Sequence, residues 1–129
     1  MNILYCGDSN IEEGLALSAL SLLDHQTEPL HLYVLTAGLT WQGKTYRPIS
    51  SESLQKLEFY LQRRSPESTV SRFDITELIL SNLPEANMGT RFTPCCMLRL
   101  YADRIPELPS RLLYLDTDVL CRGDLSEFY

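Results

Sequence analysis

The fold is decided by the stretch Asn2-Ile3-Leu4-Tyr5-Cys6-Gly7-Asp8-Ser9-Asn10 and by the helix and strand expected to follow it. Residues 2–6 are mostly apolar, which is typical of a strand covered on both faces, and residues 7–10 are turn formers. A helical stripe of apolar residues follows, made of Ile11, Leu15, Ala19 and Leu22 and widened by Ala16, Leu20 and Leu23. A second strand is expected over residues 30–35. This order predicts a right-handed βαβ unit and therefore a parallel sheet.

Strands and helices continue to alternate through the middle of the chain. Ser50 or Ser51 is expected to cap a helix that runs through Arg63, with Leu54, Leu57 and Leu61 on one face. Four further segments are expected: a loop over 37–48, a strand over 69–75, a short helix over 76–82 and a loop over 83–91.

The last third of the chain is expected to add one helix and one strand. Thr93-Pro94 is a good helix start, since a capping hydroxyl is followed by proline at the first helical position. This helix ends before Pro106, and residues 111–115 form a fourth strand. Together the elements predict a single α/β domain over residues 1–129, with an open Rossmann-type sheet that binds ligands beyond the carboxyl ends of its strands.

Two carboxylates follow the last expected strand, in the sequence Asp116-Thr117-Asp118. Two close carboxylates repel each other unless a cation lies between them, and carboxylate oxygens suit Mg²⁺ or Mn²⁺. Such a cation needs further oxygens, most plausibly from substrate phosphates. The alternative is a turn, in which aspartate is common.

Two other polar side chains are candidates for the same site. Asp8 follows the first strand and can accept hydrogen bonds from a nucleobase or ribose, unless this segment is only a turn in which Ser9 or Asn10 caps the helix at Ile11. Arg99 points away from the apolar arc of its helix. It can offer a fork of donors to a sugar or phosphate, or it can be a solvated side chain paired with Asp103.

Composition excludes several classes of function. The net charge of −6 and the lack of a basic run argue against a nucleic-acid partner. No stretch is long and apolar enough to span a membrane. The four cysteines, Cys6, Cys95, Cys96 and Cys121, are expected to be free thiols in a cytoplasmic protein. We assign no catalytic role to His25 or His31.

Three segments, taken in order, resemble glycosyltransferase family 8, of the lipopolysaccharide galactosyl- and glucosyltransferase type. Residues 2–10 resemble the opening strand and its uridine-binding loop, and Arg99-Leu100 matches the R-L pair of the following helix. Residues 113–120, Leu-Tyr-Leu-Asp-Thr-Asp-Val-Leu, resemble the metal motif L-Y-L-D-x-D-h-L of the family.

The resemblance implies a GT-A fold that transfers galactose or glucose from UDP-galactose or UDP-glucose to a saccharide acceptor, with retention of configuration. It implies that Asp8 and Asn10 contact uridine and ribose, and that Arg99 contacts the donor sugar or its phosphate. Asp116 and Asp118 would ligate Mn²⁺ (or Mg²⁺), which stabilises the charge that builds on the UDP leaving group.

The family places its third metal ligand, a histidine, in a later H-x-x-G-x-x-K-P-W-like motif that these 129 residues lack. We therefore expect the chain to be the N-terminal, donor-binding half of such an enzyme, truncated at its C-terminus. An uncovered sheet edge and apolar surface favour a dimer or larger homo-oligomer. Two alternatives stay open: a non-catalytic UDP-sugar-binding or assembly module, and a phosphatase resembling the haloacid dehalogenases.

Overall fold

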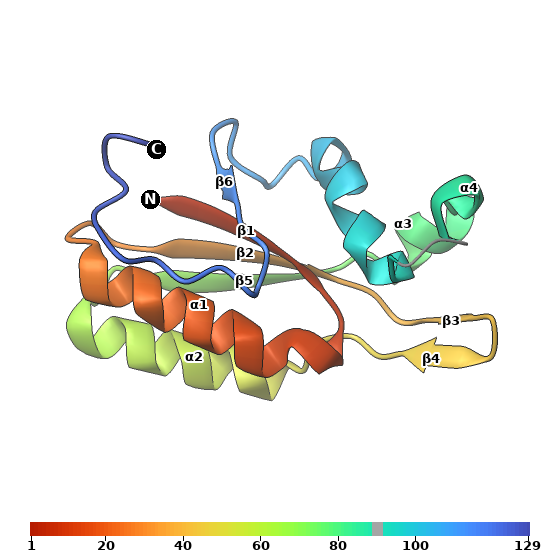
Figure 1. Cartoon of the computed structure of the whole chain (residues 1–129), viewed down its shortest axis with the longest axis horizontal. Helices are drawn as coiled ribbons and strands as arrows, with labels where there is room; N and C mark the ends of the chain where they lie inside the picture. The colour runs from red at the N-terminus through yellow and green to blue at the C-terminus, as the bar shows by residue number, and fades with distance from the viewer. Residues whose placement is uncertain (89–91) are drawn as a thin grey trace.

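The computed structural model describes residues 1–88 and 92–129, apart from the side chain of Asn87. At its centre is a parallel sheet in the order β5-β2-β1-β6 (Figure 1). The strands are β1 (Asn2–Gly7), β2 (His31–Thr36), β5 (Thr69–Asp74) and β6 (Leu113–Tyr114). The predicted βαβ unit and parallel sheet are therefore confirmed.

Helices α1 (Glu12–His25) and α2 (Ser51–Arg64) lie side by side against one face of the sheet (Figure 1). Because side chains alternate along a strand, Ile3 and Tyr5 of β1 point into this layer. The helices bury the predicted stripes there: Leu15, Ala19, Leu22, Leu54, Leu57 and Leu61. Leu20 does not belong to the α1 stripe, because it is 37% exposed.

The cap predicted for α2 is confirmed, because Ser50 Oγ accepts a hydrogen bond of 3.1 Å from the Ser53 amide. The cap predicted for α1 is wrong. A short 3₁₀ helix, η1 (Ser9–Ile11), precedes α1, and its cap is Asp8 rather than Ser9 or Asn10. Ile11 leads into α1 without a side-chain cap. The Asp8 side chain therefore caps the turn that follows β1.

The other face of the sheet is covered by α3 (Thr76–Ser81), α4 (Glu85–Met88) and the 3₁₀ helix η2 (Pro94–Arg104). The predicted bounds of η2 hold, but its type differs from the expected α-helix. Its buried residues Cys95, Leu98 and Tyr101 recur every third position, which is the period of a 3₁₀ helix. Thr93 precedes η2 but makes no capping hydrogen bond with its side chain.

Two segments expected to be loops contain regular structure. Residues 37–48 form a hairpin of β3 (Leu39–Trp41) and β4 (Lys44–Tyr46), joined by Gln42 and Gly43, which both have positive φ. That backbone is typical of a two-residue hairpin turn. The expected loop over 83–91 contains α4, and its residues 89–91 lie outside the described part of the chain.

Strand β6 is shorter and less buried than the sequence predicts. Only Leu113 and Tyr114 pair with β1, opposite Ile3 and Leu4, and both are half-buried. The Leu115 amide adds one bond of 3.0 Å to the Leu4 carbonyl. β6 is an edge strand of the sheet. The segment with Asp116 and Asp118 therefore follows an edge strand. Among the described residues, no helix is long and apolar enough to cross a membrane.

Candidate functional site

Asp8 and Asp116 follow neighbouring parallel strands and therefore lie at the same edge of the sheet. Asp8 comes directly after β1, and Asp116 comes two residues after the end of β6. Ligands of open parallel sheets bind beyond the carboxyl ends of the strands. A ligand site is therefore expected at this edge of the sheet.

Asp8 is almost fully buried, with 4% of its surface exposed. Its Oδ1 accepts hydrogen bonds from the Asn10 amide at 2.8 Å and from Asn10 Nδ2 at 2.6 Å. The carboxylate thus fixes the shape of the loop after β1, as an Asx turn and helix cap do. The bond from Nδ2 also fixes the Asn10 side chain at this edge of the sheet.

Cys95 of η2 lies against Asp8. Burial and then the negative charge of Asp8, which also bonds to the thiol, raise the pKa of Cys95 well above its usual range. A buried thiol of this kind is inert rather than nucleophilic. Asp8 thereby links the loop after β1 to the helix that covers the other face of the sheet.

Asp116 has a different environment, because its side chain is 60% exposed. Its Oδ1 accepts a hydrogen bond of 2.5 Å from the Tyr114 hydroxyl and lies 3.8 Å from Nη1 of Arg99. The Arg99 guanidinium also stacks over the Tyr114 ring, 5.0 Å from its centroid. Burial and the bond to Asp116 raise the pKa of the Tyr114 hydroxyl, so this hydroxyl stays a donor.

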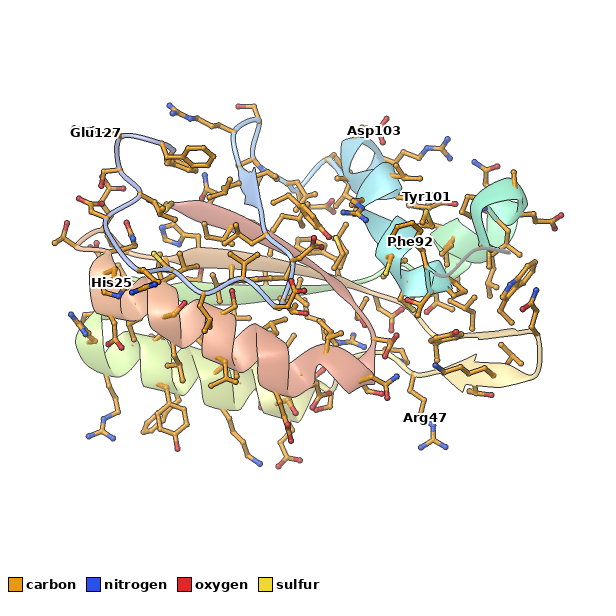
Figure 2. All side chains as sticks on the ribbon, viewed as in Figure 1. His25, Arg47, Phe92, Tyr101, Asp103 and Glu127 are labelled. Atoms are coloured by element: carbon orange, nitrogen blue, oxygen red, sulfur yellow. The ribbon has the colours of Figure 1, made fainter. Side chains whose placement is uncertain are left out.

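Arg99 therefore points into the site. The pairing of Arg99 with Asp103 that was one alternative is not what the structure shows, because Arg99 pairs with Asp116. Asp103 is exposed on the outer side of η2 (Figure 2). The three-residue period explains the difference, since it places Arg99 in line with half-buried Cys96 and Ala102.

Cys6 lies on β1 between the two acids. Burial raises the pKa of its thiol to about 12, the Arg99 charge opposes that rise, and the Asp116 charge adds to it. The charges of Arg99 and Asp116 thus both act on a thiol near the end of β1. His25, by contrast, ends α1 at the far end of the molecule (Figure 2), so the structure places it away from the candidate site.

Asp118 is exposed and lines an open hollow of about 360 Å³. The hollow is bounded by Asn10, Ile11, Gly14, Leu17, Thr117 and Leu120. Asn10 and Asp118 thus share one cavity, although they come from opposite ends of the sequence. A Cβ added to Gly14 would lie 2.9 Å from the Thr117 carbonyl oxygen, so this glycine lets the acidic loop rest on α1.

The carboxylate oxygens at this edge can serve as ligands of a divalent cation. Asp116 and Asp118 supply exposed carboxylates, and no hydrogen bond to Oδ2 of Asp116 exists among the described residues. In that part of the chain no group of three His, Cys, Asp or Glu side chains converges. The arrangement fits a hard cation that completes its shell with phosphate and water oxygens, and does not fit a closed all-protein site.

Sequence reasoning missed two residues of this site. Tyr114 lies in the segment that resembles the metal motif, but its contact with Asp116 is not predicted, although residues two apart on a strand share a face. Gly14 interrupts an amphipathic helix, which is a signal of close backbone approach. Asp8, Asn10, Arg99, Asp116 and Asp118 were all expected, and all five lie at this edge.

Comparison with solved structures shows the fold. The galactosyltransferase LgtC, in complex with donor and acceptor sugar analogs, superposes with a TM-score of 0.74 and 22% sequence identity. An active-site mutant of LgtC gives a TM-score of 0.73 and 21% identity. The matches cover 99% and 100% of this chain but 41% of either LgtC chain. The predicted α/β fold of GT-A type is thus confirmed.

Comparison of the sequence gives the family. No curated protein matches the chain. The family described as "Glycosyl transferase family 8" matches residues 2–129, which include both candidate strand ends and Arg99. This match decides against the phosphatase alternative. The protein belongs to glycosyl transferase family 8.

Proposed function

We propose that this chain binds the nucleotide-sugar donor of a family 8 glycosyltransferase, UDP-galactose or UDP-glucose, at the carboxyl edge of β1 and β6. The observation that carries the proposal is the convergence of two loops there. Asn10 and Asp118 line one hollow, and Arg99 pairs with Asp116 beside it. Family membership makes a sugar nucleotide the ligand that best fits this set.

Each residue has a proposed role in holding the donor. Asp8 fixes the loop after β1, and Asp8 and Asn10 contact uridine and ribose through their oxygen and amide groups. Arg99 donates to the donor sugar or its phosphate, because its guanidinium is half-exposed and already faces an anion.

Asp116 and Asp118 are the proposed ligands of Mn²⁺ or Mg²⁺. When bound, such an ion supplies positive charge that stabilises a diphosphate leaving group. The protein's own contribution is to hold both carboxylates beyond the end of β6 and to keep them accessible. The remaining ligands are proposed to be oxygens of the donor and of water.

The reaction proposed for the whole enzyme is transfer of the hexose to a saccharide acceptor with retention of configuration. Residues 1–129 then act as the donor-binding half of the GT-A domain, since they span 41% of the LgtC chains. All four cysteines are free thiols, in keeping with a reducing, cytoplasmic compartment. Self-association stays a prediction, to be checked by light scattering.

A second candidate is a module that binds the nucleotide sugar without turning it over. One observation fits it: no third His, Cys, Asp or Glu side chain converges with Asp116 and Asp118 among the described residues. Both candidates require the same donor site. They differ only in whether added UDP-sugar and acceptor are converted.

Calorimetric titration with UDP, with and without Mn²⁺, tests the shared claim. We expect Mn²⁺ to tighten UDP binding, and Asp116→Asn to abolish this linkage, because the variant lacks the charge that holds the ion. Asp103→Asn is the matched control, since Asp103 is exposed on η2 and away from the site. UDP affinity that is the same with and without Mn²⁺ in the wild type contradicts the proposal. Release of UDP from UDP-galactose or UDP-glucose then separates the two candidates.

A further inference from the structure

Tyr114 makes a contact that the proposed function does not use. Its hydroxyl donates to Oδ1 of Asp116 at 2.5 Å, and Nη1 of Arg99 approaches the same oxygen at 3.8 Å. No hydrogen bond to the second oxygen, Oδ2, exists among the described residues. Oδ1 of this carboxylate is therefore engaged by the protein, whereas Oδ2 belongs to a side chain that is 60% exposed.

We propose that Tyr114 is a positioning residue that restricts Asp116 to binding a cation through Oδ2 alone, and so selects Mn²⁺ or Mg²⁺ over Ca²⁺. The inference rests on the proposed function, because it takes Asp116 as a metal ligand. It goes further by assigning a role to a side chain that itself touches neither metal nor donor.

The geometry explains why the Tyr114 hydroxyl can hold this position. Tyr114 and Asp116 are two residues apart, so their side chains leave the chain on the same face. The Tyr114 ring is half-buried and packs against the second core, and the Arg99 guanidinium covers it at 5.0 Å. The core and the Arg99 guanidinium thus both contact the ring, and its hydroxyl bonds to Oδ1 of Asp116.

Ligation through a single oxygen discriminates between cations. Ca²⁺ accepts six to eight oxygens and readily takes both oxygens of one carboxylate, whereas Mg²⁺ requires a near-ideal octahedron. With Oδ1 held by Tyr114, Asp116 offers one oxygen, which suits the octahedral ion. Without the hydroxyl, both oxygens become available, and Ca²⁺ gains a ligand that Mn²⁺ does not need.

The test is Tyr114→Phe, which keeps the ring and removes only the hydroxyl. Mn²⁺ binding is measured by electron paramagnetic resonance in the presence of UDP, and Ca²⁺ is added as competitor. Loss of an outer-shell partner typically lowers metal affinity about 10–100-fold. We expect a loss of about tenfold for Mn²⁺ and a clearly smaller loss for Ca²⁺, so that the ratio of the two affinities falls.

Tyr101→Phe is the matched control. Its hydroxyl bonds to the backbone carbonyl of Asn82, so the variant loses a comparable hydrogen bond at a distance from the acids. We expect unchanged Mn²⁺ and Ca²⁺ binding in this variant. Arg99→Met is a second variant, which uncovers the Tyr114 ring and should shift the affinity ratio in the same direction as Tyr114→Phe.

The outcomes separate this inference from the proposed function. Wild-type protein that shows no UDP-linked Mn²⁺ binding overturns both. Normal wild-type binding with an unchanged Mn²⁺ to Ca²⁺ ratio in Tyr114→Phe overturns the inference alone.

Discussion

Asp8 and Asp116 end neighbouring strands of one sheet, yet the protein treats the two carboxylates differently. Asp8 has 4% of its surface exposed and accepts two hydrogen bonds from Asn10 within its own loop. The Asp116 side chain is 60% exposed, and contacts from the described residues engage only its Oδ1. Oδ1 of Asp8 thus shapes the loop that is proposed to contact uridine and ribose, whereas most of the Asp116 carboxylate stays accessible to a cation.

The difference shows that position at the edge of a parallel sheet does not by itself define a ligand. A buried carboxylate is tolerated only when its hydrogen bonds are satisfied, and that requirement commits the bonded oxygen to holding the loop. An exposed carboxylate keeps its solvation and can exchange water for a cation at little cost. Substitutions at or near the two acids should therefore act on different observables.

Among the substitutions, Gly14→Val should have the largest effect on stability, and it disturbs the loop that carries Asp116. The new Cβ would meet the Thr117 carbonyl oxygen at 2.9 Å, so the acidic loop must move. Overpacking typically costs about 1–3 kcal/mol, measured here as the free energy of unfolding in urea. Mn²⁺-linked UDP binding should fall as well. Gly123→Val is the control, because a Cβ there meets nothing within 4 Å; equal effects of both changes would contradict the prediction.

Alkaline pH should destabilise the protein through Cys6, which lies between the two acids. Burial raises the pKa of this thiol from about 9 to about 12. Above pH 9 the unfolded chain releases the proton while the folded chain keeps it, so stability falls as the pH rises, until about pH 12. For one group the slope is about 1.4 kcal/mol per pH unit. Urea unfolding at several pH values should give a shallower slope for Cys6→Ser; identical slopes would show that Cys6 is not the cause.

Replacement of each acid by alanine tests the comparison directly. Asp8→Ala removes the cap of η1, and loss of such a cap typically costs about 1 kcal/mol. Asp116→Ala should change stability by less than about 0.5 kcal/mol, since exposed positions contribute little. Thermal or urea unfolding of both variants provides the measurement. A larger loss for Asp116→Ala would reverse the roles assigned to the two acids.

Arg99→Met should also have only a small effect on stability. The ion pair with Asp116 is partly exposed on both sides, and such pairs contribute about 0.2–1 kcal/mol. Because salt screens exposed charges, the difference between variant and wild type should shrink at high ionic strength. A loss that persists in high salt would indicate that packing of Arg99 on Tyr114 matters more than its charge.

The first half of the fold was predictable because its signals are strong and agree with one another. Residues 2–6 and 30–35 form apolar runs, and the α1 stripe has a clear helical period. The β3–β4 hairpin escaped because its strands have three residues each and its turn is Gln42-Gly43 rather than Asn-Gly. Composition does not predict the positive φ of Gln42.

The residues of the candidate site could be predicted from the sequence, but the contacts between their side chains could not. Asp116 and Asp118 stand out in the sequence, whereas the pairing of Arg99 depends on the helix type. An α-helical wheel turns Arg99 away from the sheet, and the 3₁₀ period of η2 turns it toward Asp116. That period arises from packing of Cys95, Leu98 and Tyr101 against the sheet, which local sequence does not determine.

The shortness of β6 has a consequence for motion. Only two of its residues pair with β1, whereas β1 and β2 pair over six positions. Segments with few backbone bonds and little burial open at low free energy, well before global unfolding. The acidic loop should therefore exchange its amide hydrogens early in the apo protein. Ligand binding should slow that exchange, because the ligand would hold the loop against the sheet.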